Sequence, residues 1–226
     1  MHVTDLPERT QDYLKELFDH EERNGVDLPL ALGDLAAALN QKLPTASEAV
    51  KRLAAKELVV HERYRGVTLT ELGRDLSRQV ARRHRLLETF LVETLGYTWD
   101  EVHDEADVLE HACTDRFIAR LDAHLNHPTR DPHGDPIPRA DGSTDPLSTC
   151  TLAGLTVGQK VIMEQVNDDD PELLRFLAAQ NMRPGTEVEL VKPPIAGLLH
   201  ISVDGGEPFA LAEVAAREIT VRSNAE

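Results

Sequence analysis

Apolar residues recur at helical spacing through the first quarter of the chain. Their pattern predicts three helices, over residues 7–23, 30–39 and 45–56. Asn24-Gly25 is a typical helix end, a polar break at 40–43 separates the second and third helices, and Pro44 suits the first turn of the third. The chain therefore begins with a helix that precedes a helix-turn-helix.

A hairpin is predicted directly after the third helix. Two β-prone runs within 58–70 enclose a tip made by residues 63–66, and a helix-turn-helix followed by such a hairpin is a winged helix. In that arrangement the second helix enters the major groove of DNA while the wing reaches phosphates. We expect these residues to face the groove: Lys42, Thr45, Ser47 and Glu48. Pro44, which opens the same helix, belongs to the expected DNA-binding set. We expect these residues to contact the DNA backbone: Lys51, Arg52, Arg63 and Arg65. The alternative is a winged helix that serves only as a protein-interaction module.

The rest of the pattern predicts a helical part and then a β part. Apolar stripes predict a long helix over 70–93, one that begins near 99 and one over 115–125, and their surplus apolar surface favours a dimer interface. Prolines and glycines in 127–150 predict a linker or an extended arm that is not packed. A small β-barrel is predicted from a helix at 171–180 and β-prone runs at 158–163, 186–191, 198–203 and 218–221.

Charge is distributed unevenly along the 226 residues, whose net charge is −16. Residues 1–92 hold 14 Lys and Arg against 15 Asp and Glu, whereas residues 93–226 hold 10 against 25. An acidic protein is a poor candidate for non-specific nucleic-acid binding, so a role on DNA must depend on local placement of basic groups. The absence of a long apolar run and of a signal-peptide pattern predicts a cytoplasmic protein without a membrane partner, with Cys113 and Cys150 reduced.

Groups that bind metal ions gather on two of the predicted helices. His103, Asp107, Glu110 and His111 have the spacing i, i+4, i+7 and i+8, which places them on one helix face. His84 and Glu88 form a second i, i+4 pair. A single such pair is more often a solvated face. The whole set is self-repelling unless a cation neutralises it, so it predicts metal binding. We interpret His124, His127 and His133 as surface residues.

Three segments, 82–88, 102–111 and 132–138, carry a resemblance over essentially the full length to the diphtheria toxin repressor family of metal-dependent transcriptional regulators. The C-terminal part resembles the SH3-like domain of the longer members and of a small ferrous-transport accessory protein, through 155–158, 182–186 and 215–221. The fold class implied is mainly α with β, and its parts are a winged helix-turn-helix DNA-binding domain (1–73), a helical metal-binding and dimerisation domain (74–140), a linker (141–150) and an SH3-like, FeoA-like small β-barrel (151–226).

The resemblance also implies two metal sites. Its primary site would take these ligands: Asp12, Asp107, Glu110 and His111. Its ancillary site would take His84, Glu88 and His103, completed by an acidic group of the SH3-like domain, for which Asp170 is the best match and Glu172 a neighbouring candidate. A Gln that some relatives use in that loop is replaced here by Leu173.

The same resemblance bears on the metal. Iron-responsive relatives place Met and Cys where this chain has Asp12 and Asp107, whereas manganese-responsive relatives place carboxylates there, and hard oxygen ligands suit Mn²⁺. We therefore expect a Mn²⁺-activated repressor of metal-uptake genes that binds palindromic DNA as a homodimer. Lys15 departs from the short manganese regulators, which are acidic there, so their paired-ion geometry is not expected.

Other functions were weighed against that expectation. Fe²⁺ is the second choice of metal within the same family. A metal-binding or storage protein without DNA specificity would be favoured by lack of any preferred DNA sequence. A metal-dependent hydrolase is disfavoured because the chain has no HExxH motif and its ligands suffice to close the sites, so we expect no enzyme.

Overall fold

The computed structural model describes residues 2–26 and 28–223. Their contacts divide the chain into two compact units, one made of residues 1–84, 108–118 and 138–144, and the other of 85–107, 119–137 and 145–226. Among the described residues, no helix has both the length and the apolar character needed to cross a bilayer.

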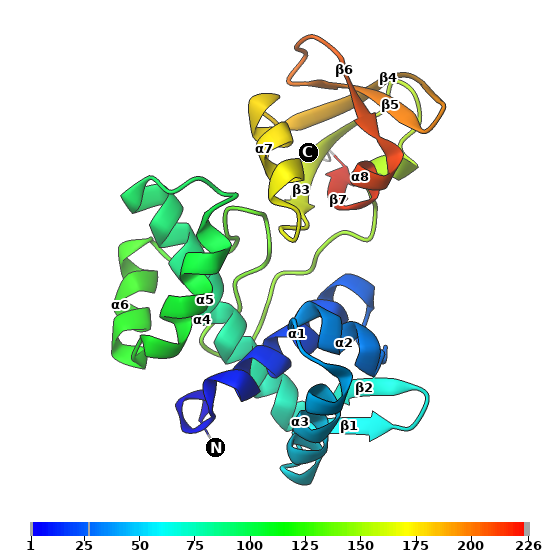
Figure 1. Cartoon of the computed structure of the whole chain (residues 1–226). Coiled ribbons are helices and arrows are strands. Elements are labelled where there is room, and N and C mark those ends of the chain that lie inside the picture. The colour runs from blue at the N-terminus through cyan, green and yellow to red at the C-terminus, as the bar shows by residue number, and fades with distance from the viewer. Residues whose placement is uncertain (1, 27, 224–226) are drawn as a thin grey trace. The chain divides into compact units, whose positions relative to one another are not determined.

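The first unit contains the predicted winged helix (Figure 1). Its elements are a 3-10 helix (Val3–Asp5), α1 (Glu8–Asn24), α2 (Leu32–Ala38), α3 (Leu43–Ala55), β1 (Val59–Glu62) and β2 (Gly66–Leu69). Strands β1 and β2 pair antiparallel, and Leu30 adds a bridge to Val67. The apolar positions that predicted the helices meet in one core, which includes Leu14, Leu17, Leu35, Val50 and Leu58. The 3-10 helix at the start was not predicted.

A long helix, α4 (Glu71–Leu95), leaves the wing and continues from the first unit into the second. It is followed by α5 (Val102–Ala112) and α6 (Asp115–His124), so the ligand helix begins three residues later than expected. Gly73 lies inside α4, where a larger residue would not fit. A Cβ at this position would be 1.9 Å from the carbonyl oxygen of Leu58. The glycine therefore allows α4 to pass close to the backbone that leads into β1.

A five-stranded antiparallel sheet organises the second unit, in the order β6-β5-β4-β3-β7. Its strands are β3 (Lys160–Val166), β4 (Glu187–Ile195), β5 (Leu198–Val203), β6 (Phe209–Ala212) and β7 (Ile219–Ser223). The helical elements of this part are a 3-10 turn (Leu152–Gly154), α7 (Pro171–Ala179) and α8 (Glu213–Arg217). The small β-domain was predicted; β6 and α8 were not. Trp99 joins its core and donates a hydrogen bond to the carbonyl of Leu174 at 3.1 Å.

The prediction that residues 127–150 form an unpacked arm is wrong for the stretch around His133. This segment has only isolated bridges, yet His133 is fully buried and its carbonyl accepts a hydrogen bond from the backbone N–H of Val166 at 2.9 Å. Arg85 donates to the carbonyl of Pro136 at 2.7 Å. A proline-rich loop can be buried when other elements supply the partners of its backbone groups, which composition does not reveal.

We expect Gly73→Ala to lower the free energy of unfolding by about 2 kcal/mol or more, because the added methyl group meets a backbone carbonyl that cannot move aside cheaply. Gly33→Ala in α2 is the matched control, since nothing lies within 4 Å of its Cβ position. Alanine there should leave stability unchanged or raise it by up to about 1 kcal/mol. Urea unfolding of both variants measures the difference, and equal effects would contradict the close approach of α4.

Candidate metal centres

The first group of candidate ligands brings α1 together with the end of α5. Asp12, Glu110 and His111 offer ligand atoms that lie within 4.8 Å of one another. Nε2 of His111 is 3.0 Å from Oδ1 of Asp12 and 3.6 Å from Oε1 of Glu110. Glu110 is buried, and the other two are half-buried. We call these three residues the first cluster.

Two further side chains lie against Glu110. Nδ1 of His84 is 2.6 Å from Oε2 of Glu110, so this residue, which the resemblance assigned to the ancillary site, contacts the first cluster. Nζ of Lys15 is 3.4 Å from the same carboxylate oxygen. The hydrogen bond with Asp12 raises the pKa of His111, although burial opposes the shift. Asp107 lies on α5 three residues before Glu110 and pairs with His103 at 3.6 Å.

The second group of candidate ligands lies inside the second unit. Glu88, Asp131 and His133 are all buried and offer ligand atoms within 4.8 Å of one another. Nδ1 of His133 is 3.8 Å from Oε2 of Glu88 and 4.0 Å from Oδ2 of Asp168. We call Glu88, Asp131, His133 and Asp168 the second cluster.

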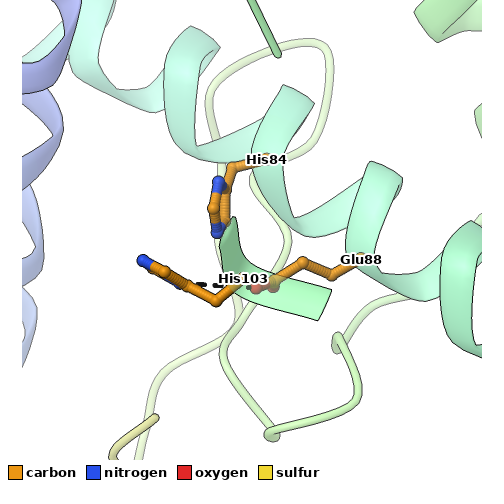
Figure 2. Close-up of side chains that lie close together, drawn as sticks. All are labelled: His84, Glu88 and His103. Atoms are coloured by element: carbon orange, nitrogen blue, oxygen red, sulfur yellow. Dashed lines mark ion pairs between the residues drawn. The ribbon is translucent and has the colours of Figure 1, made fainter. Parts of the chain in front are cut away.

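His103 extends the second cluster toward solvent. Its Nδ1 lies 2.9 Å from Oδ2 of Asp168 and 3.7 Å from Oε1 of Glu88. Figure 2 shows the pair of Glu88 and His103, with His84 one turn before Glu88 on α4. Three residues expected at the ancillary site are therefore close together. His84 and Glu88 lie one turn apart on α4, and Glu88 pairs with His103.

The electrostatics of the second cluster are set by burial and by the closeness of several carboxylates. Burial raises the pKa of Asp131 well above its usual range, and the neighbouring carboxylates of Asp135 and Glu88 raise it further. Burial alone would lower the pKa of His133, but attraction to the carboxylate of Glu88 raises it to about 10. Burial opposes ionisation of Asp168, yet the hydrogen bond with His103 lowers its pKa. Protons thus supply the positive charge here, and a divalent cation would have to displace them.

The orientation of His133 fits a metal ligand. Its Nε2 lies 2.6 Å from the carbonyl oxygen of Trp99, which can only accept, so Nε2 carries the proton. Nδ1 is buried, and no described residue gives it a hydrogen bond. A neutral His133 would therefore direct a lone pair toward the carboxylates of Glu88 and Asp168. A histidine whose other nitrogen donates to a carbonyl is the usual arrangement around a protein-bound metal ion.

Asp168, rather than Asp170 or Glu172, is the acidic residue of the C-terminal part that contacts His103. Asp170 caps the N-terminus of α7, accepting from the backbone N–H of Glu172 at 2.9 Å, and both residues are exposed. The ligand set expected from the sequence also left out Asp131 and His133. His133 lies inside the run 132–138 that carried part of the family resemblance, which was the available signal, whereas Asp131 lies just before that run.

The interpretation of His133 as a surface residue is wrong, because its side chain is completely buried. His124 and His127 are exposed, as interpreted. Ring stacking with Trp99, at 6.0 Å between centroids, contributes to the burial of His133. A residue in a loop becomes a core residue only through the packing of distant segments, here α4, β3 and the Trp99 region.

The residues expected to contact DNA lie on α3 and the wing of the first unit. Pro44 occupies the first turn of α3, Ser47 is half-buried, and the rest of the set is exposed, namely Lys42, Thr45, Glu48, Lys51, Arg52, Arg63 and Arg65. Glu48 and Lys51 pair with each other at 2.6 Å, and Arg65 pairs with Glu62 at 2.8 Å. These groups are accessible to a ligand at the start of α3 and at the wing.

Three known family models match most of the chain between them. Residues 5–67 match the model described as iron dependent repressor, N-terminal DNA binding domain, residues 70–139 match its metal binding and dimerisation domain, and residues 150–223 match the FeoA domain.

Individual relatives extend over nearly the full length. The iron-dependent repressor IdeR of Mycobacterium leprae is 32% identical, with 97% of this chain and 99% of that protein covered. A solved manganese-dependent transcriptional repressor in complex with manganese is 40% identical, with a TM-score of 0.88 and coverage of 95% and 99%. The manganese regulator SloR is 33% identical, with a TM-score of 0.78 and coverage of 95% and 98%.

We expect His133→Ala to lower the free energy of unfolding by about 1–3 kcal/mol in chelator, because the carbonyl of Trp99 loses its donor. The loss should be larger in excess Mn²⁺, since the second cluster also loses a ligand. His127→Ala removes a histidine whose side chain is 71% exposed and should change neither value. Urea unfolding with and without Mn²⁺ measures both effects. If Mn²⁺ stabilises the His133 variant as much as the wild type, the second cluster is not a metal site.

Proposed function

Because this chain belongs to the diphtheria toxin repressor family of metal-dependent transcriptional repressors, we propose that it is activated by Mn²⁺ and then binds palindromic operators of metal-uptake genes. Its relatives are transcriptional repressors and not enzymes. A DNA-binding part and a dimerisation part are matched in one chain, which supports a homodimer on DNA. We retain the division into residues 1–73, 74–140, 141–150 and 151–226 as part of this proposal.

The donor set is the observation that carries the choice of manganese. The candidate ligand groups among the described residues contain carboxylates and imidazoles and neither cysteine. Hard oxygen ligands suit Mn²⁺, whereas sulfur ligands favour more thiophilic ions. The solved repressor with bound manganese supports the same choice through its 40% identity. Fe²⁺ is the second candidate, because the curated relatives that this chain matches include iron-dependent repressors.

We assign two metal sites. The first would take Asp12, Glu110 and His111, with His84 and Asp107 as the further donors nearest along α4 and α5. The second would take the second cluster and His103, with Asp168 in the role that the resemblance gave to Asp170 or Glu172.

Asp12 connects metal binding to the DNA-binding part. It lies on α1, which contributes Leu14 and Leu17 to the core that also holds Val50 of α3. When bound, the metal ion would be held by Asp12 of α1 together with Glu110 and His111 of α5, and its positive charge would offset both carboxylates. Asp12 would then hold α1 against α5, and through the shared core α1 would hold α3. In a homodimer, this shifts the population toward the spacing at which two recognition helices enter successive major grooves.

Asp12→Ala should abolish Mn²⁺-dependent operator binding at ordinary metal concentrations while leaving the dimer intact. Loss of a residue that only hydrogen-bonds to a metal ligand commonly lowers metal affinity by about 10–100-fold. Loss of a ligand itself should therefore lower the Mn²⁺ affinity by at least this factor. Glu8→Ala removes an exposed carboxylate one turn earlier on α1 and is the matched control. Fluorescence anisotropy of labelled operator gives the affinity, and light scattering gives the oligomeric state. Unchanged operator affinity in the Asp12 variant would rule out its assignment as a ligand.

Selection of genomic DNA fragments under anaerobic conditions tests the metal and the DNA together. We expect Mn²⁺ to enrich one palindromic site, because in this proposal a bound divalent cation links Asp12 of α1 to Glu110 and His111 of α5. The chelator should enrich none. Equal enrichment with Fe²⁺ would show that the carboxylate ligands do not select manganese. No enrichment under any condition would favour a metal-binding or storage protein without DNA specificity.

A further inference from the structure

Lys15 places an ammonium group beside the first cluster. It lies on α1 three residues after Asp12, so the two side chains share a helix face. Nζ of Lys15 is 3.4 Å from Oε2 of Glu110 and 3.1 Å from Nδ1 of His84. The lysine side chain is only 13% exposed. A half-buried ammonium group therefore contacts two of the groups that would ligate a metal ion.

Glu110 is the residue whose charge needs this partner most. Its side chain is 1% exposed, and a buried carboxylate without a nearby positive charge is strongly destabilising. Lys15 and His84 contact the same oxygen of the Glu110 carboxylate, Oε2, which lies 2.6 Å from His84. The other oxygen, Oε1, pairs with His111. The ammonium group thus compensates the carboxylate at the same oxygen that His84 contacts.

We propose that Lys15 is the built-in counter-ion of the first cluster, which competes with the metal ion for Glu110 and so sets the metal concentration at which the protein is activated. Without metal, the ammonium group keeps α1 and the end of α5 together despite the carboxylates of Asp12 and Glu110. A divalent cation that binds the first cluster must move this ammonium group away from Glu110. This inference rests on the proposed role of the first cluster as a metal site.

The chemistry of lysine suits this competition. An ammonium group is a compact charge on a flexible four-carbon stem, so it can withdraw along α1 toward water without unfolding the helix. Two cations that share one carboxylate in a site with little water repel each other strongly. The affinity for metal is therefore reduced by the cost of displacing or crowding the lysine. Removing the positive charge should make the cluster less stable when empty and tighter for metal.

Lys15→Met tests the competition, because methionine keeps an unbranched side chain and removes the charge. Arg9→Met is the matched control, since Arg9 also pairs with a carboxylate of the first cluster, Oδ2 of Asp12 at 3.3 Å, but is 74% exposed. Mn²⁺ affinity is measured from the electron paramagnetic resonance signal of free Mn²⁺. The binding phase that disappears in Asp12→Ala identifies the first cluster. Thermal unfolding in chelator gives the stability of the empty protein.

We expect Lys15→Met to bind Mn²⁺ about tenfold tighter or more in that phase and to unfold at a lower temperature in chelator. Arg9→Met should remain within about threefold of wild-type affinity, because water screens its charge. Lys15→Gln, which is uncharged but can still hydrogen-bond to His84, should also bind more tightly and serves if the methionine variant does not fold.

Three results would overturn the inference. Unchanged or weaker Mn²⁺ affinity in both Lys15 variants would show that the lysine only stabilises the helices. An equal gain of affinity in Arg9→Met would show that any nearby charge acts in this way. If wild-type protein has no binding phase that Asp12→Ala removes, the first cluster is not a metal site and the proposed function fails. This result is distinguishable from the first two, because the comparison of wild type with Asp12→Ala involves no Lys15 variant.

Discussion

Burial of charged side chains along the middle of α4 is the constraint on which the rest of the structure depends. Arg83, His84, Arg85 and Glu88 are all buried within six residues of one helix. A helix with this many buried charges is stable only when each charge finds a partner. Arg83 pairs with Asp115, and the other three contact parts of the two clusters and the loop around Pro136. The fold around α4 is therefore arranged by charge as much as by apolar packing.

The two clusters meet this constraint in different ways. In the first cluster, Lys15 and His111 supply positive charge to Glu110 and Asp12, so the empty site is compensated by side chains. In the second cluster, compensation comes from protons, because burial and neighbouring carboxylates raise the pKa of Asp131, and attraction to the carboxylates raises the pKa of His133 although burial opposes it. A divalent cation would displace the ammonium group of Lys15 and the proton of His111 at the first cluster, and protons alone at the second.

An acidic chain can still bind DNA because its basic groups are placed at one part of the first unit. Lys51, Arg52 and Arg63 are exposed on α3 and the wing, whereas the excess of acidic residues follows residue 92. Neutralisation of buried carboxylates by metal would reduce the net charge of −16 that opposes approach to a polyanion. Activation by metal would then change both the geometry and the overall electrostatics of the repressor.

The sequence by itself predicted most of the helices and strands, and its resemblance to a known family named Asp12, Glu110 and His111 as ligands. Helical periodicity, the wing and the spacing of Glu110 and His111 are local features, and α1 to α5 lie within a few residues of their predicted ranges. Only the tertiary structure decided the second cluster, since it joins Glu88 of α4, a proline-rich loop with His133, and Asp168 before α7. Composition predicts such a loop to be exposed, because burial of an irregular segment depends on hydrogen-bond partners from distant parts of the chain.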